Sequence, residues 1–388
     1  MPTFYNFREN GLDYSFDDIF VPADLFRDGN LFTWGNGSYG RLGDNTVTNK
    51  STPVTTFAGG TNWKQVSSGG LHCAAIKTDG TLWTWGNGSF GRLGDNTVTS
   101  KSTPVTTFAG GTNWKQVSAG NIHCAAIKTD GTLWTWGYGT LGRLGDNTVT
   151  DKSTPVTTFA GGNNWKQVSA GSFHCAAIKT DGTLWTWGLG GDGQLGDNTI
   201  TNKSTPVTTF AGGTNWKEVS SGYKHCAAIK TDGTLWTWGL GTYGALGDNT
   251  ATNKSTPVTT FAGGTNWKQV SGSAHSVAIK TDGTLWTWGI GTSGQLGTNT
   301  ITSKSTPVTT FAGGTNWKKV SAGDRYCAAI KTDGTLWTWG LGGDGQLGDN
   351  TVTNKSTPVT TFAGGTNWKQ VSTGGNHCVA IQYIDPVL

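Results

Sequence analysis

The chain has 388 residues, of which only 13% are charged, and its formal net charge is +4 with Lys residues that recur evenly. This weak, even charge argues against a nucleic-acid-binding patch, and the lack of any run of 18 apolar residues excludes a transmembrane helix. The opening residues MPTFYNFREN lack the apolar core of a secretion signal. We therefore expect no nucleic-acid partner, no membrane insertion and no secretion.

Residues 1–27 form a separate segment, because they share nothing with the sequence that follows. Five carboxylates against two Arg give this segment a net charge of −3. Its aromatic content favours an ordered attachment segment over a disordered leader, since disordered segments usually contain few aromatics. The residues expected to dock on another surface are Phe4, Tyr5, Phe7, Tyr14, Phe16, Phe20 and Phe26.

From Asp28 onward the chain repeats, with near-identical copies of the stretch KTDGTLWTWG found at residues 77–86. The Asp-Gly pairs begin at Asp28, Asp79, Asp130, Asp181, Asp232, Asp282 and Asp333. Their spacing is 51 residues five times and 50 once. A period of this length indicates a solenoid or a propeller, so we interpret residues 28–388 as one repeat domain rather than several globular ones.

One complete unit starts at Trp63 and contains four strand-like runs: WKQVSSG, LHCAAIK, TLWTWG and STPVTTF. Asp79-Gly80 between the second and third runs predicts a hairpin with a two-residue turn. A long Gly-rich loop, NGSFGRLGDNTVTSK, precedes the fourth run. Pro104 in that last run indicates an edge strand, because proline cannot donate to a sheet.

Seven such units predict an all-β, seven-bladed β-propeller of 51-residue, four-stranded repeats. The array starts and stops partway through a unit, so the N-terminal and C-terminal strands would share the closing blade and leave no open edge. An open solenoid is the alternative, but it would need distinct capping repeats.

Each unit also repeats three aromatic positions, one His and one Cys. Trp83 and Trp85 alternate with Leu82 and Thr84 and therefore lie on one strand face, which predicts a Trp-rich core between blades. The Cys position can be filled by Ser276, so we interpret it as a small buried packing residue. The His position, filled once by Tyr326, is interpreted as a structural hydrogen-bonding site rather than a metal site.

The repeated pattern is V-S-x-G-x-x-H, an apolar strand, D-G, a strand ending in W-G and then G-x-x-G-x-L-G. This pattern resembles that of the regulator-of-chromosome-condensation propeller family. The resemblance covers residues 28–384 and implies a seven-bladed propeller closed by both termini. Nucleotide exchange, known in nuclear members, is disfavoured because the even spacing leaves no room for their inserted wedge. Photoreception, known in plant members, is disfavoured because no Trp lies just before the repeated His.

The segment FYNFRENGLDYSFDDIFVPADLF, followed directly by nearly identical repeats, is similar to the leader of propeller-repeat proteins of marine tailed phages. That resemblance implies a location on the phage particle. Residues 1–27 would then contact other virion proteins and the propeller would be displayed.

The seven copies differ mainly in two short windows, one just before the repeated His and one just after Trp-Gly. In a four-stranded meander both windows are turns at the same end of a blade, whereas the uniform turns KTDG and AGGTNW lie at the other end. Varied loops on a rigid frame are typical of recognition surfaces, although drift in loops is the alternative. The candidate partner-binding residues are Tyr39, Arg41, Leu71, Phe90, Arg92, Ile122, Tyr138, Leu141, Phe173, Leu189, Asp192, Tyr223, Lys224, Tyr243, Asp324, Arg325, Asp344 and Asn376.

No catalytic constellation is found, because no carboxylate pair is singled out and the G-x-G-x-x-G runs do not lead into a helix. We therefore expect a non-enzymatic propeller without metal or cofactor, recognising a host-surface protein or glycan from a phage virion. The alternatives are a decoration protein that contacts only virion subunits and a cellular interaction or inhibitor module in the cytoplasm.

Overall fold

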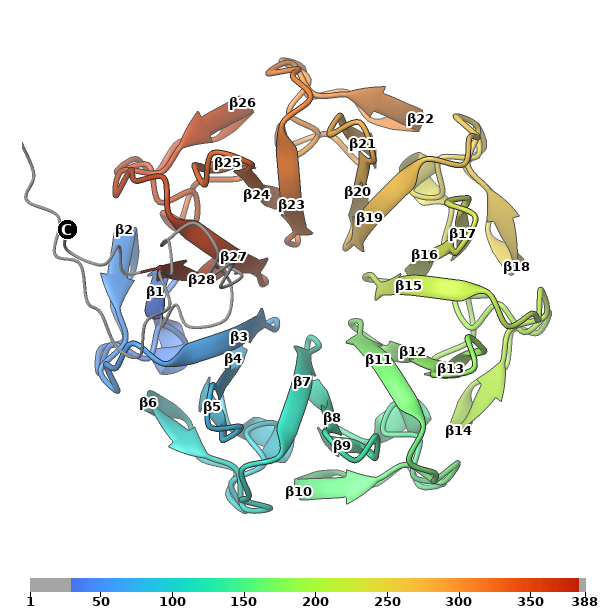
Figure 1. Cartoon of the computed structure of the whole chain (residues 1–388), viewed down its shortest axis with the longest axis horizontal. Helices are drawn as coiled ribbons and strands as arrows, with labels where there is room; N and C mark the ends of the chain where they lie inside the picture. The colour runs from blue at the N-terminus through green and yellow to red at the C-terminus, as the bar shows by residue number, and fades with distance from the viewer. Residues whose placement is uncertain (1–28, 384–388) are drawn as a thin grey trace, which may run out of the picture.

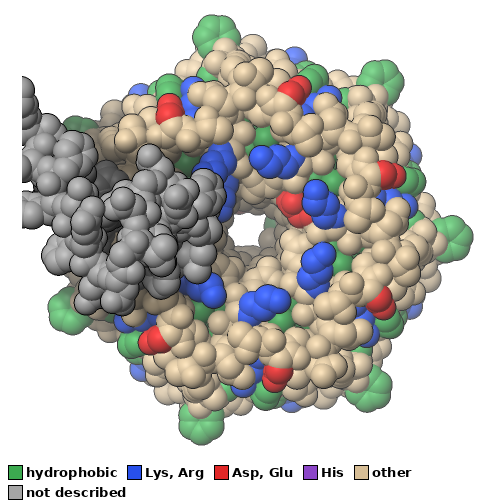
Figure 2. All heavy atoms as spheres, in the orientation of Figure 1, with side chains coloured by type: hydrophobic (Ala, Val, Ile, Leu, Met, Phe, Trp, Pro, Cys, Tyr) green, Lys and Arg blue, Asp and Glu red, His purple; other side chains and the backbone are tan. Residues whose placement is uncertain are grey.

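One repeat folds into one antiparallel sheet in the computed structural model, which describes residues 29–383. Strands β3 (Trp63–Ser68), β4 (His72–Lys77), β5 (Leu82–Gly86) and β6 (Lys101–Thr106) pair in that order, from the centre of the molecule outward. Seven such sheets are arranged in a ring (Figure 1), and the space-filling view shows an open channel on its axis (Figure 2). The all-β, seven-bladed prediction is confirmed.

The other five blades formed by a single stretch of chain repeat this order, and four loops contain a short 3-10 turn. Their bounds are β7 (Trp114–Ala119), β8 (His123–Lys128), β9 (Leu133–Gly137) and β10 (Lys152–Thr157); β11 (Trp165–Ala170), β12 (His174–Lys179), β13 (Leu184–Gly188) and β14 (Lys203–Thr208); β15 (Trp216–Ser221), β16 (His225–Lys230), β17 (Leu235–Gly239) and β18 (Lys254–Thr259); β19 (Trp267–Gly272), β20 (His275–Lys280), β21 (Leu285–Gly289) and β22 (Lys304–Thr309); β23 (Trp317–Ala322), β24 (Tyr326–Lys331), β25 (Leu336–Gly340) and β26 (Lys355–Thr360); and the turns η1 (Ser38–Gly40), η2 (Ser89–Gly91), η3 (Thr140–Gly142) and η4 (Thr242–Gly244).

The seventh blade joins the two ends of the chain. Its strand order is β2 (Lys50–Thr55), β1 (Gly29–Gly35), β28 (His377–Tyr383) and β27 (Trp368–Thr373). β1 and β28 pair along their whole length, with Gly29 opposite Tyr383. This pairing removes the free edges of an open array and confirms the predicted closure. Residues 1–27, with the aromatic docking residues proposed for them, lie outside the described residues.

The Asp-Gly hairpin differs from the predicted two-residue turn. The Lys77 N–H donates to Thr81 O, so three residues, 78–80, form the loop. The type I′ two-residue turn that Asp-Gly favours would need positive φ at both central residues, but only Gly80 has it, with φ of 80°. Asp79 instead accepts bonds from the backbone N–H and the hydroxyl of Thr81 at 2.9 and 2.7 Å, which shapes a three-residue turn.

The hydrophobic core lies between blades rather than inside one sheet. Trp63, Cys73 and Trp85 of one blade pack against Leu31 and Val379 of the preceding blade, and all five are buried. The Trp85 indole N–H donates to the backbone oxygen of Arg41 across this junction at 3.0 Å. The predicted inter-blade Trp core is confirmed for Trp63 and Trp85, and Trp83 packs against it while half-buried.

The repeated His and Cys residues meet at the junctions between blades. His72 Nε2 lies 3.0 Å from Cys124 Sγ of the next blade, and His377 Nε2 lies 3.1 Å from Cys73 Sγ, which completes the circle. Where Ser276 replaces Cys, its hydroxyl lies 2.8 Å from His225 Nε2. These side chains are buried, in agreement with the structural roles that the sequence indicated.

The innermost strands are joined by amide side chains around the channel. Gln65 Nε2 donates to Val117 O at 2.8 Å, and its Oε1 accepts the Val117 N–H at 2.9 Å. In the β15–β18 blade Glu218 replaces the amide and accepts the Val270 N–H at 2.9 Å. Burial raises the pKa of Glu218 to about 7, although the Val270 bond opposes that rise.

Candidate binding site on the varied rim

Both varied windows lie at one end of each blade and contact each other directly. The Asn87 N–H, just after Trp-Gly, donates to Leu71 O, just before His72, at 2.9 Å. At the opposite end the Thr78 N–H of the uniform hairpin donates to Asn62 O of the other uniform loop at 2.8 Å. We call these two ends the varied rim and the uniform rim. Their predicted separation is confirmed.

The loop after each third strand takes one of two conformations. In the first, a large residue has left-handed backbone geometry: Tyr39, Phe90, Leu141 and Tyr243 have φ between 58° and 67°. In the second, the N–H of Asp192, Ser293 or Asp344 donates to the side chain of a Gln two residues later, at 2.7 to 2.8 Å. The varied window therefore sets the shape of its loop as well as its surface.

Arg41 and Arg92 are buried, whereas the prediction placed them on the exposed varied face; Arg41 still lines a hollow on the axis. Only 4% of Arg41 and 2% of Arg92 are accessible to solvent. Their Nε groups donate to the loop carbonyls of Ser38 and Ser89 at 3.0 Å, and burial lowers the pKa of Arg92 to about 10. Each guanidinium also lies beneath the ring two residues earlier, at 5.9 Å for Tyr39, and therefore supports the loop from below.

Aromatic residues from four consecutive blades form two ring pairs linked by a cation, which we call the aromatic arc. The Phe90 and Tyr138 ring centroids are 4.5 Å apart, and those of Phe173 and Tyr223 are 5.4 Å apart. Arg143 bridges the two pairs, with its guanidinium 4.7 Å from the Tyr138 ring and 5.6 Å from the Phe173 ring. Arg143 was not among the candidate partner-binding residues, although it occupies the same repeat position as Arg41 and Arg92.

One ion pair and two large exposed rings extend this surface. Lys224 Nζ lies 3.1 Å from Asp192 Oδ2, which joins the β15–β18 blade to the β11–β14 blade. Tyr39 and Tyr243 are 51% and 58% exposed. Asp324, Arg325 and two rings of the arc, Phe90 and Tyr223, are also exposed. The remaining candidates are half-buried: Leu71, Ile122, Tyr138, Leu141, Phe173, Leu189, Asp192, Lys224, Asp344 and Asn376.

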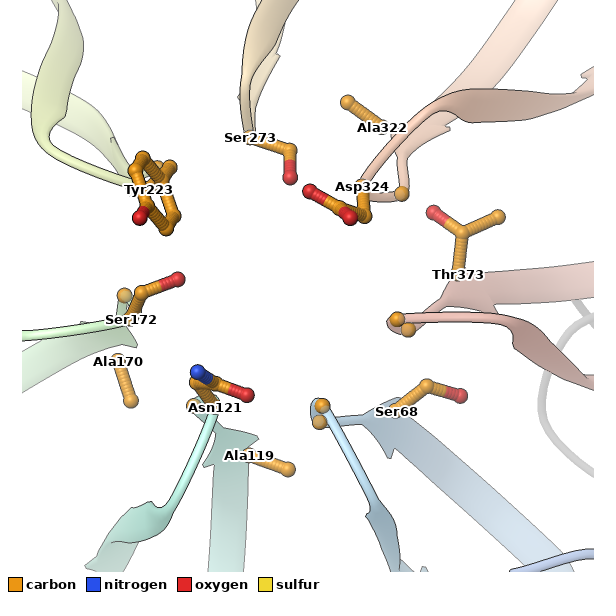
Figure 3. Close-up of a pocket in the computed structure, with 18 of the residues that line it drawn as sticks. Ser68, Ala119, Asn121, Ala170, Ser172, Tyr223, Ser273, Ala322, Asp324 and Thr373 are labelled. Atoms are coloured by element: carbon orange, nitrogen blue, oxygen red, sulfur yellow. The ribbon is translucent and has the colours of Figure 1, made fainter. Parts of the chain in front are cut away.

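On the axis, the first turns of the blades surround a polar hollow of about 320 Å³. Figure 3 shows Asn121, Ser172 and Tyr223 facing Ser273 and Asp324 across this opening. Beside it, the Asn376 amide donates to Asp344 Oδ2 at 2.9 Å. The hollow therefore offers hydroxyl, amide and carboxylate groups next to one aromatic ring, which suits hydrogen bonding to a polar ligand group.

The arrangement offers binding groups rather than reactive ones. Burial raises the pKa of the Cys73 thiol to about 12, although a Ser68 hydrogen bond and Arg41 oppose that rise, so it is a poor nucleophile. Within residues 29–383, no three His, Cys, Asp or Glu side chains gather as a metal site would require. No helix of this part of the chain is long and apolar enough to span a membrane.

Comparison with known proteins identifies the family. The family model of the RCC1-like domain matches residues 30–380. The chain belongs to the RCC1-like domain family. RCC1-like propellers are protein-interaction modules, and the family resemblance inferred from the repeated motif is thereby confirmed.

RCC1-like relatives include the ultraviolet-B receptor UVR8 of Arabidopsis thaliana, 32% identical over 59% of this chain and 53% of that protein. The E3 ubiquitin-protein ligase HERC2 of Homo sapiens is 30% identical over 91% of this chain but only 6% of that protein. The chain thus spans about half of the first relative and a small part of the second. Their named activities belong to those proteins.

Solved RCC1-like structures show the same fold. Prp20p of Saccharomyces cerevisiae, described for its binding to Gsp1p and histones, matches with a TM-score of 0.81 and 20% identity, covering 93% of this chain and 92% of that one. Human WBSCR16 matches with a TM-score of 0.81 and 21% identity, covering 92% and 99%. At this identity the likeness concerns the fold alone.

Proposed function

We propose that this RCC1-like propeller is a non-enzymatic binding module that docks a macromolecular partner on its varied rim. The aromatic arc carries this proposal: Phe90, Tyr138, Phe173 and Tyr223 form two ring pairs linked by Arg143. Aromatic side chains dominate the energetics of many protein interfaces because they bury much area at low entropic cost. Arg143 is itself only 1% exposed, so it supports the rings rather than contacting the partner. The hollow beside the arc would accept polar groups of the same partner.

A more specific form of the proposal places the protein on a phage particle, with the varied rim facing a host-surface protein or glycan. It is supported by the leader-like residues 1–27 and by the concentration of differences in two windows. Residues 1–27 would contact other virion proteins. A decoration protein, whose varied rim contacts only virion subunits, is the competing form, and both are separate from a cellular module in the cytoplasm.

Paired variants test the binding surface. Phe90→Ser with Tyr223→Ser removes two exposed rings from the arc, whereas Phe108→Ser with Phe210→Ser removes two exposed rings elsewhere, which are 66% and 65% exposed. Cross-linking and mass spectrometry of the full chain in its native source should show partners that are lost with the first pair and retained with the second. Equal capture by both pairs would contradict a varied-rim site.

The proposed location of the protein on a phage particle is tested separately. Imaging of particles with a label on the varied rim distinguishes an outward-facing rim, as in an adhesin, from a rim buried between virion subunits. Absence of the protein from every particle fraction would remove the phage form and leave the cellular module. The binding proposal would stand in all three cases, since it depends only on the paired variants.

A further inference from the structure

The uniform rim carries a second candidate surface, built from one lysine at the same place in every blade. This lysine is the second residue of each innermost strand, directly after a buried Trp. We call the set the lysine ring: Lys64, Lys115, Lys166, Lys217, Lys268, Lys318 and Lys369. Figure 2 shows Lys and Arg side chains gathered around the channel opening. The even recurrence of Lys in the sequence argued against a basic patch. The fold nevertheless gathers these lysines into a cluster, because the propeller holds every copy at the same distance from its axis.

The packing of the innermost strands leaves these side chains directed at solvent. In β3, Trp63 is buried and Gln65 bonds the next blade, so Lys64 between them is exposed. Six of the seven lysines are exposed, and Lys369 is half-buried, with Nζ 4.7 Å from the Tyr383 ring. The ion pairs found within residues 29–383 all involve other lysines.

The channel wall beneath the ring adds one cation, Lys319, and one carboxylate, Glu218, to the ring lysines. A hollow of about 360 Å³ is lined by Lys268, Lys318 and Lys319, and Glu218 is the carboxylate among its lining residues. Lys319 stands where most blades have Gln. Like charges held around a low-dielectric opening concentrate the electrostatic field on the axis.

The surroundings of the ring favour a compact ligand over a long one. The hairpin aspartates Asp79, Asp130, Asp181, Asp232, Asp282 and Asp333 are exposed. In Figure 2 the acidic side chains lie mostly nearer to the edge than the basic side chains around the opening. An extended polyanion lying across the rim would pass over these carboxylates, whereas a compact one on the axis would stay within the circle of ammonium groups.

We propose that the lysine ring binds a compact polyanion, a small molecule with several phosphate or sulfate groups, on the channel axis. Lysine ammonium groups form charge-assisted hydrogen bonds with such oxygens and adjust easily to their positions. Because the ligand sits at the uniform rim, this activity is independent of the partner proposed for the varied rim.

Isothermal titration of the full chain with inositol hexakisphosphate at low salt tests the proposal. The triple variant Lys64→Gln, Lys166→Gln, Lys268→Gln should weaken binding at least tenfold. The control triple Lys101→Gln, Lys152→Gln, Lys203→Gln changes the net charge equally, but it removes lysines that pair with Asp95, Asp146 and Asp197, and should leave binding within twofold. Thermal melts of both variants establish that each is folded.

Three outcomes would overturn the proposal. The first is no heat of binding for the wild-type chain, and the second is an equal loss of affinity in both triple variants, which would indicate a general effect of net charge. The third is tighter binding of long-chain polyphosphate than of inositol hexakisphosphate at equal total phosphate, which would indicate an extended ligand.

Discussion

His72 Nε2 lies 3.0 Å from Cys124 Sγ, and this single contact joins two neighbouring blades inside the core. Each imidazole takes its partner from the following repeat, so the contacts form a circle around the propeller. Tyr326 completes the circle where His is missing, since its hydroxyl accepts a contact from Cys378 Sγ at 3.6 Å. The stability of the ring is therefore tied to the protonation state of these His residues.

The buried His residues predict loss of stability in acid. Burial lowers the pKa of His174, His275 and His377 to about 3, below the unfolded value of about 6.5. The unfolded chain therefore binds protons first as pH falls, so stability is complete above pH 6.5 and decreases below it. The decrease is about 1.4 kcal/mol per pH unit for each His. Urea unfolding at pH 7.5, 6 and 5 measures it, and equal stability at all three would contradict the buried neutral state.

Substitution of Cys124 tests the contact itself. Cys124→Ser should change stability by less than about 1 kcal/mol, because Ser276 already makes the same contact with His225 at 2.8 Å. Cys124→Val fills the space but leaves the buried His72 Nε2 without a polar partner, which costs about 1–3 kcal/mol. Urea unfolding at pH 7.5 measures the free energy of unfolding of both variants. Equal stability would show that the contact is only packing.

Glu218→Gln should stabilise the propeller at alkaline pH. The amide can donate to the Val270 carbonyl as the other blades do, and it has no charge to bury. With the pKa of Glu218 at about 7, its stabilising neutral form is present at low pH and is lost as pH rises from the unfolded value of about 4.3 through 7. The gain should be about 1–3 kcal/mol at pH 8 and smaller at pH 5. Gln167→Glu, the reverse change one blade earlier, should show the opposite trend.

Phe90→Gly should separate stability from binding. Phe90 has φ of 63°, a conformation that costs a residue with a side chain about 1–2 kcal/mol and costs Gly little. Loss of the ring contact with Tyr138 partly offsets the relief, so the melting temperature should stay constant or rise. Phe108→Gly relieves no such backbone strain and should lower the melting temperature. Partner capture should fall only for Phe90→Gly, and a fall in both would indicate general damage.

Gly94→Ala and Gly110→Ala isolate a steric contact. Both glycines have positive φ, of 68° and 54°, so both variants carry the same backbone strain of about 1 kcal/mol. A Cβ at Gly94 would lie 2.8 Å from Trp136 Nε1, whereas one at Gly110 meets nothing within 4 Å. Gly94→Ala should therefore be at least about 2 kcal/mol less stable than Gly110→Ala in urea unfolding. Equal values would mean that Trp136 can move aside.

The repeat by itself determined the fold, because a fixed period, alternating apolar positions and a half-unit offset at both ends admit few closed arrangements. It determined the Trp core, the edge position of Pro104 and the ends at which the windows lie. It also indicated the correct roles for His72 and Cys73, which depend on burial that local pattern reveals.

Tertiary structure decided which residues meet across blades, because such contacts join positions about one repeat apart that no local pattern links. Arg41 and Arg92 looked like surface residues, but loop carbonyls and overlying rings bury them. Arg143 links the two aromatic pairs because the fold places its blade beside the blade that carries Phe173. The lysines, evenly spaced along the chain, became one cluster because seven-fold closure places equivalent residues around a single axis.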